Sequence, residues 1–334
     1  MKPKVFVTRA IPDEGLALIR ESSEMKLWEQ ELPPPREVLL REVKEIDGLL
    51  SLLTDKIDAE LMDAAPRLKV ISNYAVGFDN IDIPGATARR IPVGNTPGVL
   101  TDTTADFAFT LLMAAARRVV EGADYVRQGK WKTWGPKLLT GMDIHHATLG
   151  IIGFGRIGQG MARRASGFDM RILYYDVYRR QDLEESMGVR YAELDTLYRE
   201  ADFITIHTDL NETTRHMMND LAFAKMKTTA ILINTARGPI VDPAALYEAL
   251  SSGKIRAAAL DVTEPEPIAP DSPLLKLPNC LIVPHIASAS VATRARMAEM
   301  AAANLLAGVH GERLPHCVNS SIYGKIEESH PISR

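Results

Sequence analysis

Short apolar runs alternate with amphipathic stretches along most of the chain. The runs have the length of buried strands, and apolar residues in the stretches between them recur at helical spacing. Parallel strands need a crossover, usually a helix, so this alternation predicts an α/β fold with parallel sheets. Strands are expected at residues 4–9, 24–29, 48–53, 69–75 and 91–96, and then at 149–152, 170–176, 203–208, 230–237, 257–262 and 280–285.

The longest helical pattern runs from Thr101 to Gly129 and is apolar nearly all round through Ala116. Such a helix must be covered on most of its sides, and a second subunit is one source of that cover. Trp131 and Trp134 follow it, and they fit an interface, a ligand crevice or ordinary core packing. Further helices are expected at 37–46, 243–251 and 289–309, the last of which leads back to the first domain.

A glycine-rich turn follows the strand expected at 149–152. Gly153, Gly155 and Gly158 stand in G-x-G-x-x-G spacing between that strand and a helical pattern. In a dinucleotide-binding turn the first glycine allows the bend, the second lets backbone N–H groups approach a pyrophosphate, and the third lets the helix pack on its strand. The positive end of the helix dipole favours the phosphates. The pattern therefore predicts a doubly wound dinucleotide domain with its switch point at this strand.

Asp176 closes the following strand, about twenty residues after the glycine turn, as this fingerprint requires. Its carboxylate could accept hydrogen bonds from a ribose 2′-OH and would repel a 2′-phosphate, so the sequence favours NAD over NADP. Arg179 and Arg180 leave NADP open as an alternative. They could neutralise Asp176 and tolerate a 2′-phosphate, or they could be solvated surface charges.

Composition narrows the range of functions. The 334 residues, 46% of them hydrophobic, can bury two ordinary cores, so two domains are expected. A net charge of −4 with mixed signs argues against nucleic acid or a membrane surface as a partner. Neither a signal peptide nor a membrane span is expected. Cys280 and Cys317 are too few for a disulfide framework or a zinc site, which suits a reducing cytoplasm.

Polar or flexible residues follow several predicted strands, and the carboxyl ends of parallel strands line a ligand crevice. In the first domain the loops 54–56 and 75–80 are candidates for holding a substrate. In the second domain the segments 234–238, 261–267 and 284–288 would face the same crevice as the dinucleotide. Each segment alone has an ordinary structural explanation, but their coincidence beside a nicotinamide indicates catalysis.

Motifs of one enzyme family are spread over the whole chain, namely KVFVTRAIP, YAVGFDNIDI, NTPGVLTDTTADFAF, GIIGFGRIGQ, ILINTARGPIVD, ALDVTEPEP and VPHIASA. They resemble the D-isomer-specific 2-hydroxyacid dehydrogenases, and within them the glyoxylate/hydroxypyruvate reductases. The resemblance implies a Rossmann-type doubly wound nucleotide domain, residues 100–287, inserted in a flavodoxin-like α/β substrate domain, residues 1–99 plus 288–334. It also implies a homodimer built around the long helix, a small 2-oxo or 2-hydroxy acid as substrate, and NAD as cofactor with NADP as an alternative.

The family's catalytic Arg, Glu and His fall on Arg237, Glu266 and His285. Reduction of a 2-oxo acid needs a hydride at C2, a proton for the developing alkoxide and a fixed carboxylate. His285 can supply the proton, and Glu266, bonded to the other ring nitrogen, would fix the tautomer and stabilise the imidazolium. Arg237 offers a planar fork that can bind the carboxylate and polarise the carbonyl.

The resemblance also implies binding contacts. The backbone N–H groups of Val76 and Gly77 look like a second carboxylate clamp, with Leu53 as a further substrate contact. Asp261 is expected to bind the carboxamide or orient the nicotinamide. Thr104 resembles a phosphate or nicotinamide contact, and a hydroxyl at a helix start is equally explained by capping. The expected cofactor contacts are Thr104, Phe154, Gly155, Arg156, Ile157, Gly158, Asp176, Thr235, Ala236, Asp261 and Ala287.

Two positions depart from the family pattern. Asp209 stands where the family usually has proline, which concerns the loop on the adenine side, and Ala287 replaces a usual glycine, which adds a methyl group near the nicotinamide.

Other functions on this fold are weighed against the same residues. Phosphite dehydrogenase, a member of the same family, is an alternative, but the lysine it has before the glycine is Val76 here. Phosphoglycerate dehydrogenases usually carry a regulatory extension for which this chain ends too soon, and formate dehydrogenases have glutamine at the position of Glu266. An NAD-sensing protein like the C-terminal binding protein corepressors is the second alternative, and the lack of long disordered tails argues against it.

Overall fold

The computed structural model describes residues 1–324, which divide into two compact units. Unit 1 consists of Met1–Leu100 and the chain from Ser290 onward, and unit 2 consists of Thr101–Ala289. The family resemblance implies boundaries at 99/100 and 287/288, and the ligand that each unit binds stays a prediction. Residues 325–334, which were counted in the predicted substrate domain, lie outside the described residues.

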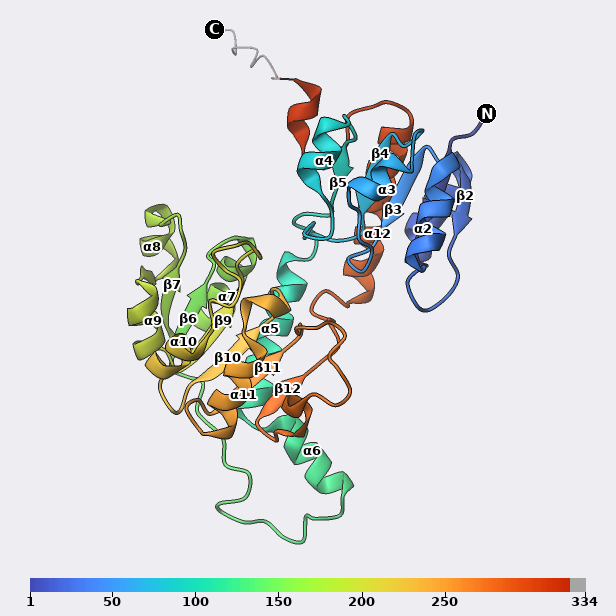
Figure 1. The fold of residues 1–334 in the computed structure, drawn as a ribbon. Helices are drawn as coiled ribbons and strands as arrows, with labels where there is room; N and C mark the ends of the chain where they lie inside the picture. Colours follow the sequence, from blue (N-terminus) through green and yellow to red (C-terminus); the bar gives the residue numbers. More distant parts are fainter. Residues whose placement is uncertain (325–334) are drawn as a thin grey trace, which may run out of the picture. The chain divides into compact units, whose positions relative to one another are not determined.

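Unit 1 contains a parallel sheet of β1 (Lys4–Val7), β2 (Glu24–Leu27), β3 (Gly48–Ser51), β4 (Val70–Asn73) and β5 (Val93–Gly94) (Figure 1). Its strand order is β2-β1-β3-β4-β5, the flavodoxin-like order that was predicted. The helical elements are α1 (Asp13–Ser22), α2 (Arg36–Glu42), η1 (Val43–Glu45), α3 (Ala59–Asp63), α4 (Ile83–Ala88), α12 (Val291–Val309) and η4 (Ser320–Tyr323).

The two faces of this sheet have separate cores because side chains alternate along a strand. Val5 and Val7 of β1 pack under α1 and α12. Phe6, between them, packs under α2, α3 and α4 on the other face. Ser290 caps α12 by accepting the N–H of Thr293 at 3.2 Å, which sets the start of the helix.

Unit 2 contains a parallel sheet of β6 (Thr148–Ile152), β7 (Arg171–Tyr175), β8 (Val189–Tyr191), β9 (Phe203–Ile206), β10 (Ile231–Asn234), β11 (Ala257–Leu260) and β12 (Cys280–Ile282). Its order is β12-β11-β10-β9-β6-β7-β8. Strands β7 and β8 lie on one side of β6, and β9 to β12 lie on the other. This reversal of the strand order at β6 confirms the predicted Rossmann-type switch point. Strand β8 is an addition to the six strands predicted for this domain.

The helical elements of unit 2 are α5 (Thr101–Ala116), α6 (Val119–Arg127), α7 (Arg156–Ser166), α8 (Gln181–Met187), α9 (Leu194–Glu200), α10 (Asp220–Lys225), η2 (Gly238–Ile240), α11 (Pro243–Ser251) and η3 (Pro273–Lys276). Helices α5 and α7 cover one face of the sheet, and α9, α10 and α11 cover the other (Figure 1). No helix within residues 1–324 is both long enough and apolar enough to cross a membrane.

The prediction of one continuous helix from Thr101 to Gly129 is wrong. Helix α5 ends at Ala116, and Arg118 has a left-handed backbone with φ of 55° before α6 begins. The carbonyl oxygen of Ala116 accepts the N–H of Met142 at 2.9 Å. A distant segment therefore takes the acceptor that the next turn of an uninterrupted helix would use.

Candidate functional site

The three glycines after β6 have different surroundings. Gly153 has φ of 91°, and a Cβ there would lie 2.6 Å from backbone atoms of His207. A Cβ on Gly158 would lie 2.2 Å from the carbonyl oxygen of Gly153, whereas one on Gly155 would meet no atom within 4 Å. Gly155 is also the N-cap of α7 and offers no side-chain cap to the first-turn N–H groups. Positions 153 and 158 thus need glycine for the protein's own packing, and position 155 leaves room for an anionic group at a helix N-terminus.

Asp176 follows β7 and holds its carboxylate against the glycine turn. Its Oδ2 accepts the N–H of Phe154 at 2.7 Å, and its Oδ1 accepts the N–H of Tyr178 at 3.0 Å. The Phe154 ring is buried and stacks on Tyr174 with 4.2 Å between ring centroids, so its side chain belongs to the core. The carboxylate keeps further lone pairs for a ribose hydroxyl.

Two arginines beside this carboxylate are paired locally. Arg179 donates to Glu184 at 2.7 and 2.9 Å, and Arg180 donates to Asp182 at 2.9 and 2.7 Å. Both guanidinium groups form two hydrogen bonds with one carboxylate. A 2′-phosphate would have to compete with these acids for the arginines.

The turn after β10 is closed by a buried amide. Asn234 Oδ1 accepts the N–H of Ala236 at 3.0 Å, and Asn234 Nδ2 donates to the carbonyl of Arg237 at 2.9 Å. Arg237 Nη1 donates to the carbonyl oxygen of Ala236 at 2.8 Å. Thr235, 8% exposed, has a buried Oγ1 with no hydrogen-bond partner among the described residues. An orphaned buried hydroxyl in this turn fits a contact with a bound cofactor.

The loops after β11 and β12 bring an acid and an imidazole together. His285 Nδ1 lies 2.5 Å from Glu266 Oε1. Asp261 is 1% exposed and fixes the His285 loop, because its carbonyl accepts the N–H of His285 at 2.9 Å and its carboxylate accepts those of Ile286 at 2.6 Å and Ala287 at 2.9 Å. Burial raises the pKa of the Asp261 carboxyl, and these N–H groups oppose the shift. The predicted contact of Asp261 with the nicotinamide stays a prediction.

These groups lie at one edge of the sheet. Strands β10, β11 and β12 are parallel neighbours, and Arg237, Asp261 and His285 each follow the carboxyl end of one of them. Strand β6, which ends at the glycine turn, runs parallel in the same sheet. Among the other predicted cofactor contacts, Arg156 and Ile157 begin α7, and Thr104 is buried in the first turn of α5.

The loop after β4 in unit 1 presents unpaired donors. Asn95 Nδ2 donates to the carbonyl of Val76 at 2.8 Å, and Asn73 Nδ2 donates to that of Gly77 at 3.0 Å. In the part of the chain that the structure describes, no acceptor contacts the N–H groups of Val76 and Gly77. Two neighbouring free N–H groups on a fixed loop suit a carboxylate.

Leu53 lines a hollow of about 350 Å³ in unit 1. Its lining includes Asp58, Asp79 and Asp82 with a single cation, Lys56. This surplus of acidic groups does not favour an anionic substrate, so the predicted substrate contact of Leu53 draws no support from the hollow.

A family model for "D-isomer specific 2-hydroxyacid dehydrogenase, NAD binding domain" matches residues 109–287, more than half of the chain. A protein of Korarchaeum cryptofilum named glyoxylate reductase is 57% identical to this chain over 96% of it and 97% of its own length. The chain belongs to the D-isomer-specific 2-hydroxyacid dehydrogenase family. It is an NAD(P)-dependent enzyme that reduces 2-oxo acids, as the family resemblance predicted.

Two solved structures are similar to this dehydrogenase over nearly the whole length of the chain. The TT0316 protein of Thermus thermophilus is 46% identical with a TM-score of 0.89, covering 94% of this chain and 99% of its own. An NADPH-dependent glyoxylate/hydroxypyruvate reductase from Sinorhizobium meliloti, in complex with NADP and malonate, is 33% identical with a TM-score of 0.85 and covers 95% and 97%. The predicted fold class is therefore confirmed.

One polar cluster of the dehydrogenase was not expected from its sequence. Glu264 binds Arg215 and His216, which are 49 and 48 residues away in the chain. In the sequence, Glu264 was only a member of the segment 261–267, which is expected to face the dinucleotide crevice. The only local signal was the position of Glu264 two residues before Glu266.

Proposed function

We propose that this dehydrogenase reduces glyoxylate or hydroxypyruvate to the corresponding 2-hydroxy acid. The observation that carries the proposal is the contact between His285 Nδ1 and Glu266 Oε1 at the sheet edge that also carries Arg237. The substrate class draws support from relatives named glyoxylate reductase, at 57% and 51% identity over 96% of this chain.

Each of these residues has a role that follows from its chemistry. Glu266 accepts a hydrogen bond from the Nδ1–H group of His285, and the other ring nitrogen, Nε2, then donates its proton to the oxygen on C2. Arg237 binds the substrate carboxylate and polarises the neighbouring carbonyl. When bound, the reduced dinucleotide supplies the hydride that C2 receives. The imidazole then recovers its proton from solvent, and the balance is one hydride and one proton per substrate reduced.

The cofactor contacts predicted from sequence are compatible with NAD. The open space at Gly155, the uncapped start of α7 and the orphaned hydroxyl of Thr235 would hold its phosphates and nicotinamide half. Asp176 would bind the adenosine ribose, and the pairing of Arg179 and Arg180 with neighbouring acids favours NADH over NADPH. In unit 1, the free N–H groups of Val76 and Gly77 would bind a carboxylate, the role predicted for them.

A substrate panel tests this function. NADH or NADPH oxidation is followed with glyoxylate, hydroxypyruvate, pyruvate and longer 2-oxo acids, and NAD⁺ reduction is followed with phosphite. The highest kcat/KM is expected for glyoxylate or hydroxypyruvate with NADH. Faster turnover of phosphite would identify a phosphite dehydrogenase, and NADH binding without turnover of any 2-oxo acid would identify a dinucleotide sensor.

A homodimer and a cytoplasmic location belong to the same proposal. None of the described residues of α6 is buried, and Trp131 and Trp134 after it are 58% and 77% exposed. A second copy of this chain would cover this apolar surface. Light scattering should therefore give twice the chain mass, and Trp134→Asp should lower it, whereas a monomeric wild type would contradict the dimer. Both cysteines are free, which suits a reducing compartment.

A further inference from the structure

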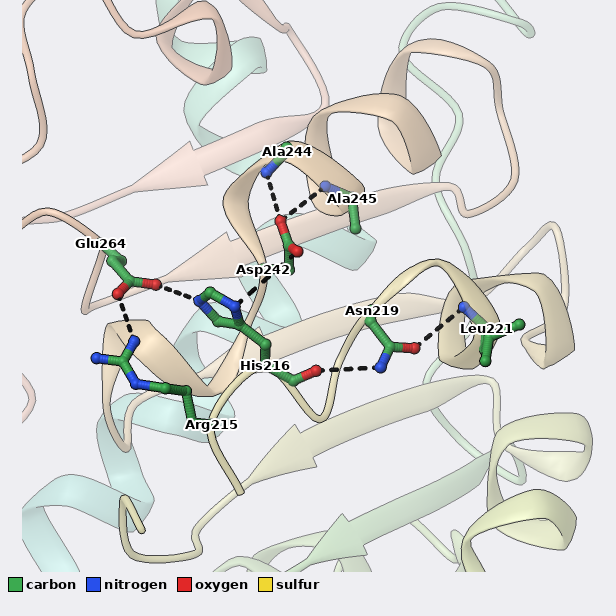
Figure 2. A network of polar contacts seen from close by, with 8 residues as sticks. All are labelled: Arg215, His216, Asn219, Leu221, Asp242, Ala244, Ala245 and Glu264. Carbon is green, nitrogen blue, oxygen red and sulfur yellow. Dashed lines mark hydrogen bonds and ion pairs between the residues drawn. The ribbon is translucent and has the colours of Figure 1, made fainter. Parts of the chain in front are cut away.

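Glu264 is held on both of its carboxylate oxygens by consecutive residues of a distant loop (Figure 2). Arg215 Nη1 donates to Oε1 at 2.7 Å, and His216 Nε2 lies 2.5 Å from Oε2. Glu264 stands two residues before Glu266, the partner proposed for His285. The two contacts therefore restrain the backbone immediately before Glu266.

The loop that carries Arg215 and His216 is itself fixed to the segment after Arg237. The N–H of His216 donates to the carbonyl of Pro239 at 2.8 Å, and that of Met218 donates to the carbonyl of Ile240 at 3.1 Å. His216 has φ of 51°, a left-handed conformation that its hydrogen bond to Pro239 helps to hold. The loop is thus attached by two backbone hydrogen bonds to the segment that follows Arg237.

The Arg237 turn also touches the Glu264 segment directly. A Cβ on Gly238 would lie 1.9 Å from the carbonyl oxygen of Thr263, a distance that no larger residue can accept without moving the backbone. Gly238 follows Arg237, and Thr263 precedes Glu264. Two catalytic segments are therefore in backbone contact, with the Arg215–His216 pair bridging them on one side.

The charges around His216 favour this bridge. Its Nε2 faces Glu264, and its Nδ1 lies 4.0 Å from Oδ2 of Asp242 (Figure 2). Asp242 caps α11 by accepting the N–H groups of Ala244 at 2.9 Å and Ala245 at 3.1 Å. With a carboxylate on either side, the imidazole is held in one orientation, and Arg215 supplies the positive charge that Glu264 requires.

We infer that Arg215 and His216 are positioning residues for catalysis, which lock Glu264 so that Glu266 meets His285 while Arg237 keeps its place at the same sheet edge. This inference rests on the proposed roles of Glu266, His285 and Arg237. Neither Arg215 nor His216 needs to touch the substrate. Their effect on the reaction passes through the backbone between Glu264 and Glu266.

Two variants test the lock with little change to the backbone. His216→Asn keeps a residue that tolerates the left-handed conformation but is too short to reach Glu264, and Glu264→Gln keeps the shape and removes the charge. Each should lower kcat for glyoxylate by about tenfold or more, because small misplacements of reacting groups cost rate. The Kd for NADH should change by less than about twofold, since the glycine turn is untouched.

Further readouts separate positioning from plain stability. The primary isotope effect with NADH deuterated at the transferred position should rise, because the chemical step becomes slower relative to release. His216→Asn/Glu264→Gln should be no slower than the slower single variant, since both remove one contact.

Arg215→Lys should retain more kcat than Arg215→Met. Asp195→Asn is the matched control, because Asp195 also pairs with a cation, Lys225 at 2.5 Å, and it should leave kcat unchanged.

The outcomes distinguish this inference from the proposed function. If wild type reduces no 2-oxo acid, or if His285→Ala remains active, the proposed function fails. If wild type is active and His285→Ala is not, yet His216→Asn and Glu264→Gln keep wild-type kcat at a temperature where they are folded, the positioning role is overturned. A fall in thermal midpoint with an unchanged isotope effect and unchanged kcat has the same meaning.

Discussion

His285 Nδ1 lies 2.5 Å from Glu266 Oε1, although the two residues are 19 positions apart and follow different strands. The loop of His285 is fixed by hydrogen bonds that its backbone N–H groups donate to Asp261, and the loop of Glu266 is fixed through Glu264. Because Nδ1 is engaged, Nε2 is the ring nitrogen left for a substrate. This contact is compatible with the proposed roles of His285 as general acid and Glu266 as the group that orients it.

Replacement of the imidazole should separate catalysis from cofactor binding. His285→Ala should lower kcat for glyoxylate by about a hundredfold or more, because the proton donor is lost. NADH binding, measured by fluorescence titration, should persist. A loss smaller than about tenfold would remove His285 from the role of general acid.

Arg237→Lys should raise KM and lower kcat together. The lysine keeps the charge but loses the planar fork that binds a carboxylate in two places, so clamp and polariser weaken at once. Steady-state kinetics with glyoxylate and NADH check this. Wild-type constants in the lysine variant would show that the guanidinium has no contact with substrate.

Two glycine substitutions should have different effects. Gly158→Ala places a Cβ 2.2 Å from the carbonyl oxygen of Gly153, so it should destabilise unit 2, by about 1–3 kcal/mol as overpacking does, and weaken NADH binding. Gly155→Ala meets no protein atom and should weaken NADH binding with an unchanged thermal midpoint. Calorimetry and NADH titration measure both effects. Unaltered NADH affinity in Gly155→Ala would place the pyrophosphate elsewhere.

Thr235→Val tests the orphaned hydroxyl. Valine has nearly the same shape, and the Oγ1 that it removes has no hydrogen-bond partner within the described residues, so the unliganded enzyme should be as stable as wild type or slightly more so. The Kd for NADH should rise severalfold because a contact with the cofactor is lost. An unchanged Kd would mean that Thr235 does not contact the dinucleotide.

Cofactor preference should depend on the acids that pair with the two arginines. Glu184→Gln with Asp182→Asn weakens the hold on Arg179 and Arg180, and so frees their guanidinium groups for a 2′-phosphate. The ratio of kcat/KM for NADPH to that for NADH should increase by about tenfold, which corresponds to one charge-assisted hydrogen bond. No change in this ratio would show that the arginines lie out of reach of the ribose.

The strands that the sequence predicted are those whose signal is local. Each apolar run is a stretch of four to eight consecutive residues, and the glycine turn is a contiguous motif, so both can be recognised without the tertiary structure. Strand β8 was missed because it has three residues, Val189–Tyr191, of which only the first is buried. Such a run has no measurable periodicity.

The remaining differences come from contacts between distant segments. No proline or glycine lies between α5 and α6, and the hydrogen bond that occupies the carbonyl of Ala116 at this break comes from Met142, a residue distant in the sequence. Likewise, no residue pattern around Glu264 indicates that its partners are Arg215 and His216, which are 49 and 48 residues away in the chain. Residue types at strand ends indicate the chemistry, but the partners that hold them come from loops whose positions only the folded chain defines.

The core of unit 1 is closed by residues from both ends of the chain, since Val5 and Val7 pack against Ala298 and Leu305 of α12. During synthesis all residues of unit 2 are made before those of α12, so unit 2 can complete its fold before unit 1 does. Until α12 has been made, one apolar face of the sheet in unit 1 lacks the helix that covers it in the folded protein. A chain that stopped at Ala289 would therefore contain all of unit 2 but would leave this apolar face of unit 1 uncovered, and an exposed apolar face promotes aggregation.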